Sequence, residues 1–534
     1  MKNKNFMSNL KFDLPAGLVV FFVALPLCLG ISLASTSYSG IDGIEDFAGI
    51  VMPGIIAGII GGIVVGSLSG SKFGVSGPAA GLITIIAAAI IEFGGFGNGG
   101  YEKFALAVLL GGVIQTILGF LKAGLVAYYI PFSVIKGMLA GIGITILMKE
   151  IPHFFGYDKD PEGDLAFNQV DGHNTFEELG LMTDNVHIGA TIVGIASLII
   201  LIVWGQKFIK TNKILNLVPG PLVAIVASVL LSVLMVGNAD LLIAGEHLVS
   251  VPTPSNMDEF TGMFYFPDFS AITDLSVWKV AAVIAIVASI ESLLCVEATD
   301  KMDPHKGRTP MSRELVAQGV GNVFSGLLGG LPITQVIVRS TANIGAGAKS
   351  KNSAIIHGIL LLIFVLAIPG LLNMIPRATL AAVLLLIGWK LASPKSIIAM
   401  VKSGWEQYVP FFVVVIVMLL TDLLIGVGAG MVVAFLIILY SNFKMSFFMV
   451  DKSHPKEVHL KLSQHTTFLN KASIMKGLDG IEDGSSVEID LSETISIDYD
   501  VSEAIRDFQE SAEDRDITVK IIHEEKLIQA SMAH

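Results

Sequence analysis

The chain has 534 residues, of which 53% are hydrophobic and 15% are charged, and its net charge at pH 7 is −12. Soluble domains carry about 25% charged residues, so this composition excludes an ordinary soluble enzyme, a disordered chain and a disulfide scaffold. The negative charge also argues against nucleic acid as a partner, because binding it requires a basic face.

The charged residues divide the chain into two parts. Residues 446–534 hold 18 acidic and 9 basic side chains, whereas the much longer stretch 1–445 holds 28 and 25. This change of composition predicts a transmembrane domain at 1–445, followed by a small, acidic, soluble domain at 446–534.

Fourteen mainly apolar stretches occur in the first part, and a helix that spans a bilayer needs about 20 such residues. They lie at residues 14–34, 47–69, 77–91, 104–121, 131–148, 187–205, 217–236, 277–297, 312–329, 336–347, 353–370, 375–391, 408–421 and 423–443. We therefore expect an α-helical polytopic membrane protein, with seven segments in residues 1–236 and seven in 277–445. Basic residues concentrate in alternate loops, which predicts that both termini are cytoplasmic.

Two of these segments are interrupted by glycine and proline before a short apolar run. GVSGPAAG at 74–81 opens the third segment, and GGLPITQV at 329–336 opens the tenth, so each is third in its group of seven. Proline breaks the helix before it and suits the first turn of the helix after it. The pattern predicts an extended piece followed by a half-helix that begins inside the membrane.

Such paired interruptions indicate a binding site in a transporter. Two facing half-helix N-termini present N–H groups and positive dipole ends, which favour an anion. Ordinary kinked helices are the alternative, but two interruptions at the same ordinal position favour the site.

Glu291 and Arg339 are the main candidates among the ionisable residues within predicted spans, where charges are costly and usually functional. Glu291 has apolar sequence on both sides, so its desolvated carboxylate could carry a proton, help to bind a cation, or have only a structural role. Arg339 lies one turn beyond Gln335 and could serve an anion site, pair with Glu291 in the empty protein, or snorkel at the inner membrane face. No metal-ligating, nucleophilic or phosphate-binding constellation is visible in the sequence, so we expect neither a cofactor nor an enzymatic activity.

In several places the sequence resembles the SulP family of anion transporters. The matching stretches are SGPAAGL at 76–82, SIESLL at 289–294, SRELVAQGVGN at 312–322, and GGLP at 329–332 followed by Arg339 and TANIGAGAK at 341–349. The resemblance implies a seven-plus-seven inverted repeat, a core domain that moves like an elevator against a gate domain, a dimer and a cytoplasmic STAS domain. Substrates of the family include sulfate, bicarbonate, chloride and dicarboxylates.

The resemblance also places the anion between the third and tenth segments. The expected substrate-binding residues are Ser76, Gly77, Pro78, Ala79, Ala80, Thr334, Gln335, Val336, Ile337 and Arg339, and the expected coupling-ion residues are Glu291 and Cys295.

The residues at these positions favour a proton over sodium as the coupling ion. Glu291 matches an acid that is Asp in sodium-coupled bicarbonate transporters of the family and commonly Glu in proton-coupled members. The sodium pattern also has Thr where this chain has Cys295, and a Gly-Ala-Thr run where it has Gln335, Val336 and Ile337. Leu27 stands where the family often has Gln, so that wall of the site is expected to be apolar.

The tail is predicted to alternate strands and helices over residues 458–523, which is typical of a small α/β layer. It resembles a STAS domain, with IDLSETISIDYDV at 489–501 in the place of the central strand and loop. In phospho-regulated members a serine follows the loop aspartate, whereas here Tyr499 follows Asp498. A structural or dimerising role is therefore preferred to a regulatory one. Whether the domain also binds a cytoplasmic partner stays open.

The resulting prediction is a homodimeric, proton-coupled transporter of a small inorganic or carboxylate anion in the cytoplasmic membrane. The alternatives are a sodium-coupled bicarbonate symporter, an uncoupled exchanger or channel of the same fold, a nucleobase permease, and a sensor whose output is the tail. The permease is disfavoured because Arg339 suits anions better than nucleobases. The anion itself stays open, because sulfate, bicarbonate and dicarboxylates all bind half-helix N-termini by the same physics.

Overall fold

The computed structural model describes residues 6–37, 47–96, 99–162, 167–169, 172–212, 215, 218–254, 256–444, 447–449 and 456–527. The chain forms two compact units, Met1–Met431 and Val432–His534, and the division falls within the helix α20 (Leu423–Lys444). The domain boundary predicted between residues 445 and 446 lies outside the described residues.

The first unit is helical, and each of the fourteen predicted apolar stretches contains a helix. The first seven stretches contain α1 (Phe6–Ser37), α2 (Phe47–Ile60) with η1 (Gly61–Val65) and α3 (Gly66–Leu68), η2 (Ala80–Leu82) with α4 (Ile83–Glu92), α5 (Gly100–Phe120), α6 (Phe132–Phe154), α8 (Ile188–Trp204) and α10 (Gly220–Met235). The last seven contain α12 (Leu275–Met302), α13 (Met311–Leu327), α14 (Ile337–Gly345), α15 (Asn352–Ala367), α17 (Arg377–Leu391), α19 (Trp405–Leu420) and α20.

Shorter helices connect these segments. They are η3 (Ala123–Tyr129), α7 (Thr175–Leu181), η4 (Met182–Asp184), α9 (Lys207–Thr211), η6 (Gly245–His247), α11 (Met257–Gly262), η7 (Phe269–Thr273), α16 (Pro369–Leu372) and α18 (Pro394–Lys402). Seven of the described helical segments are long and apolar enough to cross a bilayer, and four shorter apolar helices have 10–17 residues. The predicted α-helical polytopic fold is confirmed.

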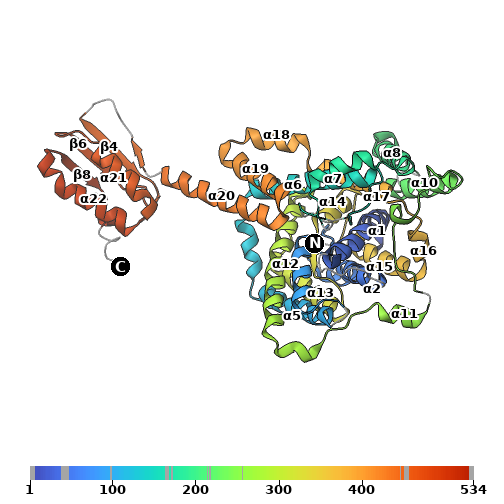
Figure 1. The fold of residues 1–534 in the computed structure, drawn as a ribbon. Helices are drawn as coiled ribbons and strands as arrows, with labels where there is room; N and C mark the ends of the chain where they lie inside the picture. The colour runs from blue at the N-terminus through green and yellow to red at the C-terminus, as the bar shows by residue number, and fades with distance from the viewer. Residues whose placement is uncertain are drawn as a thin grey trace. The chain divides into compact units, whose positions relative to one another are not determined.

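Two bundles make up this unit, and each takes helices from both halves of the sequence. In one, α5 packs along α12 and α13, and α1 packs along α2 and α15. In the other, α6 packs against α17 and α19, and α8 packs against α10 and α17. Figure 1 shows the mixing by colour, with blue α1 beside gold α15. The division into a core and a gate domain stays a prediction, and the packing shows only that each bundle takes helices from both halves.

Glycine allows α5 and α13 to approach each other closely. Gly112 and Gly119 lie seven residues apart on α5, and Gly319 and Gly326 have the same spacing on α13. A Cβ atom added at Gly112 would lie 2.5 Å from the backbone nitrogen of Val323, which cannot give way as a side chain could. Small residues at such seams are the usual means by which membrane helices pack.

The second unit contains a small four-stranded sheet. Its strands are ordered β3 (Phe447–Met449), β4 (Glu457–Leu462), β6 (Ser486–Asp490) and β8 (Thr518–Ile522); β4, β6 and β8 are parallel, and β3 is antiparallel to β4. The helices α21 (Lys471–Asp479) and α22 (Tyr499–Ser511) connect the parallel strands. Leu460, Ile489, Ile505 and Phe508 are buried in the core of this unit.

The predicted alternation of strands and helices in the tail is confirmed. The sequence did not reveal β3 or the two-stranded pair of β5 (His465–Thr466) with β7 (Ser496–Ile497). β3 follows α20 closely and shares its apolar character, so composition alone does not separate it from the membrane pattern. Asp498 caps α22 by accepting the N–H of Asp500 at 3.1 Å, which gives this loop aspartate a local structural role.

The glycine seam predicts a stability defect for Gly112→Val, because the new side chain would force α5 away from the backbone of α13. Overpacking of this kind costs about 1–3 kcal/mol or more, so the variant should unfold at a lower temperature in detergent. Gly428→Val is the control, because no atom lies within 4 Å of its Cβ position. Equal thermal stability of the Gly112→Val variant and the wild type would contradict the close packing of α5 on α13.

Candidate functional site

Two three-residue strands pair where the third and tenth segments begin. β1 (Ser76–Pro78) is antiparallel to β2 (Ile333–Gln335), with Ser76 opposite Gln335 and Pro78 opposite Ile333. η2 and α4 follow β1, and α14 follows β2. The predicted extended piece followed by a half-helix is confirmed in both segments.

The N-termini of both half-helices lack a side-chain cap. The residues before them, Ala79 and Val336, have extended backbone, and neither has a side chain that accepts a hydrogen bond from the first turn. The first N–H groups of a helix have no partner within the helix and lie at the positive end of its dipole. Two uncapped ends that begin beside one strand pair create surroundings that favour negative charge.

One face of α13 holds the strand pair in place. Glu314, Gln318 and Asn322 are spaced four residues apart and are buried. Glu314 accepts a hydrogen bond from a serine hydroxyl in the loop before β1 at 2.5 Å, and Nε2 of Gln318 donates to Oγ of Ser76 at 2.7 Å. Asn322 accepts from the N–H of Ile333 at 2.6 Å and donates to its carbonyl at 3.0 Å. α13 therefore fixes both strands at once.

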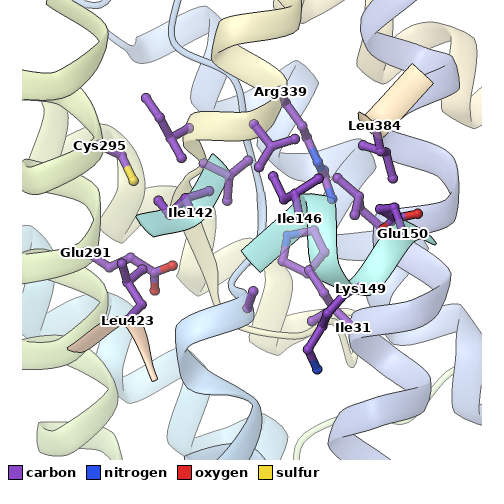
Figure 2. A pocket seen from close by; sticks show the side chains of 16 residues that line it. Ile31, Ile142, Ile146, Lys149, Glu150, Glu291, Cys295, Arg339, Leu384 and Leu423 are labelled. Atoms are coloured by element: carbon purple, nitrogen blue, oxygen red, sulfur yellow. The ribbon is translucent and has the colours of Figure 1, made fainter. Parts of the chain in front are cut away.

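A cavity of about 60 Å³ lies beside the two half-helix N-termini and is lined from both bundles (Figure 2). Its lining residues are Leu27, Ile31, Pro78, Ala80, Ile142, Ile146, Lys149, Glu150, Glu291, Cys295, Val336, Ile337, Val338, Arg339, Leu384 and Leu423. Most of them are apolar and four are charged. An apolar cavity with a few convergent polar groups is the usual form of a small-molecule site.

Glu291 reaches this cavity from α12 and is 3% exposed. Its carboxylate lies against the first turn of η2, where it interacts with the backbone N–H of Gly81. A Cβ atom at Gly81 would lie 3.2 Å from Oε2, so glycine leaves the room that the carboxylate occupies. Oε2 has no hydrogen-bond partner within the part of the chain that the structure describes. One turn further along α12, Cys295 lines the same cavity and is 2% exposed.

Arg339 is the third residue of α14, and it is 1% exposed. Its guanidinium lies against β1, where a Cβ atom at Gly77 would overlap Nη1. The alternative of a snorkelling arginine is therefore wrong, because such a side chain keeps its charged group in water. Among the described residues, no oxygen acceptor bonds the guanidinium, so the alternative of an ion pair with Glu291 in the empty protein is not realised either.

The surroundings of Arg339 on the side of α1 and α15 are also short of negative charge. The titratable groups that interact electrostatically with Arg339 are the thiol of Cys28 on α1 and the ring of His357 on α15. Both side chains are fully buried. Neither ring nitrogen of His357 has a hydrogen-bond partner among the described residues. A buried cation in such surroundings lacks the compensation that buried charges normally have.

The structure brings together seven of the twelve predicted site residues. Pro78, Ala80, Glu291, Cys295, Val336, Ile337 and Arg339 line the cavity. Leu27 lines it too, and thereby forms the apolar wall that the sequence predicts.

The other five predicted residues lie outside the cavity lining, within the strand pair or directly beside it. Ser76 bonds Gln318, and Nε2 of Gln335 donates to Oγ1 of Thr299 at 3.1 Å. Gly77 makes room for the guanidinium, and Ala79 and Thr334 are fully buried. Strand residues alternate between two faces, so residues that follow one another cannot all face the ligand.

Sequence reasoning missed the contribution of α6. Lys149 and Glu150 line the cavity from this helix, together with Ile142 and Ile146. A signal was present, since two adjacent charged residues directly follow the apolar stretch 131–148. Their position beside the half-helices depends on how the two bundles pack, and the sequence alone does not reveal this.

The sequence profile described as "Sulfate permease family" matches residues 10–417 of the chain. The YvdB protein of Bacillus subtilis (strain 168) is 28% identical over 446 residues, which cover 83% of this chain and 76% of the relative. The bicarbonate transporter BicA of Picosynechococcus sp. is 25% identical over 437 residues, or 81% and 70% of the two chains.

A solved structure with the same fold is that of the murine Solute Carrier 26 family member A9 anion transporter in the inward-facing state. Its TM-score is 0.66 at 18% identity, and the match covers 100% of this chain and 88% of that one. The family profile spans both half-helices, β1 and β2, and the residues that line the cavity from α1 to α17. The chain therefore belongs to the sulfate permease family, and it is a multi-pass membrane transporter of anions rather than an enzyme.

Proposed function

We propose that the protein is a secondary active transporter in which a small anion binds between the two half-helix N-termini and Arg339, and in which a proton on Glu291 accompanies it. The observation that carries this proposal is the cavity itself. It holds a buried guanidinium without a carboxylate partner beside two uncapped helix ends, and a buried carboxylate on its other wall.

Anion binding follows from the electrostatics of Arg339. A buried charge is stable only when it is paired and hydrogen-bonded. An oxyanion at the N-terminus of α14 would accept hydrogen bonds from the guanidinium and from first-turn N–H groups. The apolar remainder of the lining keeps the local dielectric constant low, which strengthens these interactions.

Proton coupling follows from the position of Glu291. An anion and an ionised carboxylate in one small apolar cavity repel each other, so the anion binds best when Glu291 is neutral. Arg339 and an ionised Glu291 together carry no net charge. An arriving monovalent anion with one proton keeps the cavity neutral, whereas a divalent anion requires two protons for the same balance. Glu150 is a second carboxylate on the lining that could hold the additional proton.

Sodium coupling is the second candidate, and the lining disfavours it. Hard cations prefer several oxygen ligands, but Cys295 supplies sulfur at a position where a sodium site would need an oxygen ligand. Gln335, a further candidate ligand, lies outside the lining and donates to Thr299. An uncoupled exchanger or channel of the same fold is the remaining alternative. The relative BicA is named as a bicarbonate transporter, so bicarbonate and sulfate are the first anions to test.

The two bundles suggest how the site would open to each side of the membrane. Glu291 and Arg339 belong to the bundle of α1, α12 and α14, whereas Lys149, Leu384 and Leu423 come from α6, α17 and α20. We propose that the first bundle carries the anion past the second in an elevator-type movement. The charge pattern of the loops supports cytoplasmic termini in the cytoplasmic membrane, and we propose a homodimer on the family resemblance.

Glu291→Gln should abolish proton-driven accumulation, because glutamine keeps the shape of the side chain but cannot exchange a proton. The measurement is uptake of labelled sulfate, bicarbonate and fumarate into proteoliposomes under an inward proton or sodium gradient. Glu297→Gln on the same helix is the control, because Glu297 forms an ion pair with Lys301 at 3.2 Å near the helix end. Accumulation driven by sodium alone would instead support a sodium symporter, and indifference to both gradients would support an exchanger or channel.

Arg339→Gln should raise the KM for the anion. Removing one partner of a buried charge pair costs about 2–5 kcal/mol, which corresponds to a change of about 30-fold or more. The measurement is the KM of anion exchange, together with the unfolding temperature as a check on folding. Arg313→Gln is the matched control, since Nε of Arg313 donates to the carbonyl of Leu68 at an exposed position. An unchanged KM in a stably folded Arg339→Gln variant would show that the guanidinium does not bind the anion.

A further inference from the structure

A buried cluster of titratable side chains lies where α6 ends. The carboxylate of Asp158 bonds Nδ1 of His153 at 2.8 Å and Nδ1 of His247 at 2.7 Å. The side chains of Asp158, His153 and His247 are 1%, 5% and 15% exposed. They come from the loop after α6, from α6 itself and from η6, so segments far apart in the sequence meet here. His247, the most exposed of the three, connects the cluster to solvent.

The charges of the cluster depend on one another. Burial opposes the ionisation of Asp158, but hydrogen bonds from the two histidines outweigh it and lower the pKa of Asp158. The hydrogen bond to Asp158 in turn raises the pKa of His247, although burial opposes this. The ring of His187 lies 4.4 Å from that of His247 between centroids, and burial and the charge of His247 lower the pKa of His187. An anionic carboxylate is thus held between two rings, and the ring nearer to solvent readily takes up a proton.

Glu150 links this cluster to the transport cavity. It precedes His153 by one turn on α6, so the two side chains share a face of the helix. Glu150 and Lys149 line both the central cavity and a small polar cavity of about 10 Å³ that His153 also lines, and a space of this size holds about one water molecule. Oε2 of Glu150 is buried without a hydrogen-bond partner among the described residues. Figure 2 shows Glu150 and Glu291 on opposite sides of the central pocket.

Further charged groups face the cluster from the elements packed around it. They are Lys149 on α6, Asp160 and Glu162 on the loop, Glu178 on α7, His187 before α8, Glu246 on η6, and Arg377 at the start of α17.

The loop that carries Asp158 is held firmly in place. Nη1 of Arg377 donates to the carbonyl of Asp158 at 3.4 Å. Gly30 of α1 packs so closely on the carbonyl of Glu162 that no Cβ atom would fit there. The carboxylate of Glu162 is buried without a hydrogen-bond partner in the described part of the chain, and burial raises its pKa.

We propose that His247, Asp158, His153 and Glu150 form a proton pathway between the face that carries this loop and the central cavity. A proton taken up at Nε2 of His247 releases the proton on its Nδ1 to Asp158. His153 accepts that proton at Nδ1 when it is the tautomer that carries its hydrogen on Nε2, and the Nε2 proton then leaves through the small cavity to Glu150. One proton therefore enters the chain for each proton that reaches Glu150, and no group changes its net charge. Both rings exchange tautomers before the next transfer, so that Nδ1 of His247 again carries a proton and Nδ1 of His153 is again free to accept one.

A clamp that only holds the loop against the bundle would explain the two histidine bonds. It does not explain why Glu150, one turn before His153 on α6, has a buried carboxylate oxygen without a hydrogen-bond partner among the described residues and lines two cavities at once. Buried carboxylates and histidines inside membrane proteins are expensive and commonly belong to proton relays. The pathway rests on the proposed function, because it supplies the proton that Glu291 is proposed to carry. On the predicted orientation it opens to the outside.

The test uses Asp158→Asn and His247→Gln in the full-length protein, reconstituted into vesicles that contain a pH-sensitive dye. Three quantities are measured: proton influx with the anion, proton-driven accumulation of the anion, and exchange of labelled anion at equal pH on both sides. Proton influx and accumulation should fall about tenfold or more, since positioned proton-transfer groups contribute about 10²–10⁴-fold. Exchange should stay within about twofold of the wild type, because neither residue lines the central cavity and exchange needs no net proton transfer. His173→Gln is the control, because His173 is half-exposed and pairs with Glu177 at 3.4 Å.

The outcomes separate the pathway from the proposed function. Undiminished proton influx in both variants, with a wild type that couples, would overturn the pathway and leave the proposed function intact. Exchange that falls in step with proton influx, together with a lower unfolding temperature, would show that the cluster only holds the loop, and would also overturn the pathway. A wild type that accumulates anion without protons would refute the proposed function, and the pathway with it.

Discussion

The pairing of β1 with β2 is the constraint on which the site depends. Within a membrane there is no water to satisfy backbone N–H and C=O groups, and each unsatisfied group costs several kcal/mol. Two extended segments can exist at that depth only if they satisfy each other, and Ser76–Pro78 and Ile333–Gln335 do so. Glu314, Gln318 and Asn322 complete the pairing from α13. Because the strands are fixed, the half-helices that follow them begin side by side, and their uncapped N-termini share one cavity.

Electrostatics explains why the cavity contains two opposite charges that do not neutralise each other directly. Glu291 lies against the first turn of η2, whereas Arg339 lies against Gly77 with Cys28 and His357 nearby. A direct ion pair would be a stable resting state that an anion would have to break. Under the proposed function, keeping the charges apart leaves the guanidinium available for an anion and the carboxylate available for a proton. In the proposed mechanism the anion and the proton therefore stabilise each other in the cavity. This mutual stabilisation couples the binding of one to the binding of the other.

In the proposed mechanism, one bundle carries the anion site and the other carries the proton pathway. The half-helices, Glu291 and Arg339 belong to one bundle, whereas Lys149, Glu150 and the histidine cluster near the end of α6 lie with the other. A movement of one bundle past the other would change the distance between the anion site and Glu150. The proposed proton pathway would then connect to the site in some positions of the movement and be separated from it in others, as alternating access requires.

Much of this protein follows from its sequence, because local patterns suffice for it. The apolar stretches locate the membrane helices, the Gly-Pro interruptions locate both half-helices, and alternation in the tail locates its parallel strands. Tertiary structure decides which side chains meet. Strand pairing turns Ser76, Thr334 and Gln335 away from the cavity, and bundle packing brings Glu150 into it. His153, Asp158 and His247 meet because α6, its loop and η6 converge there, and no spacing in the sequence encodes that convergence.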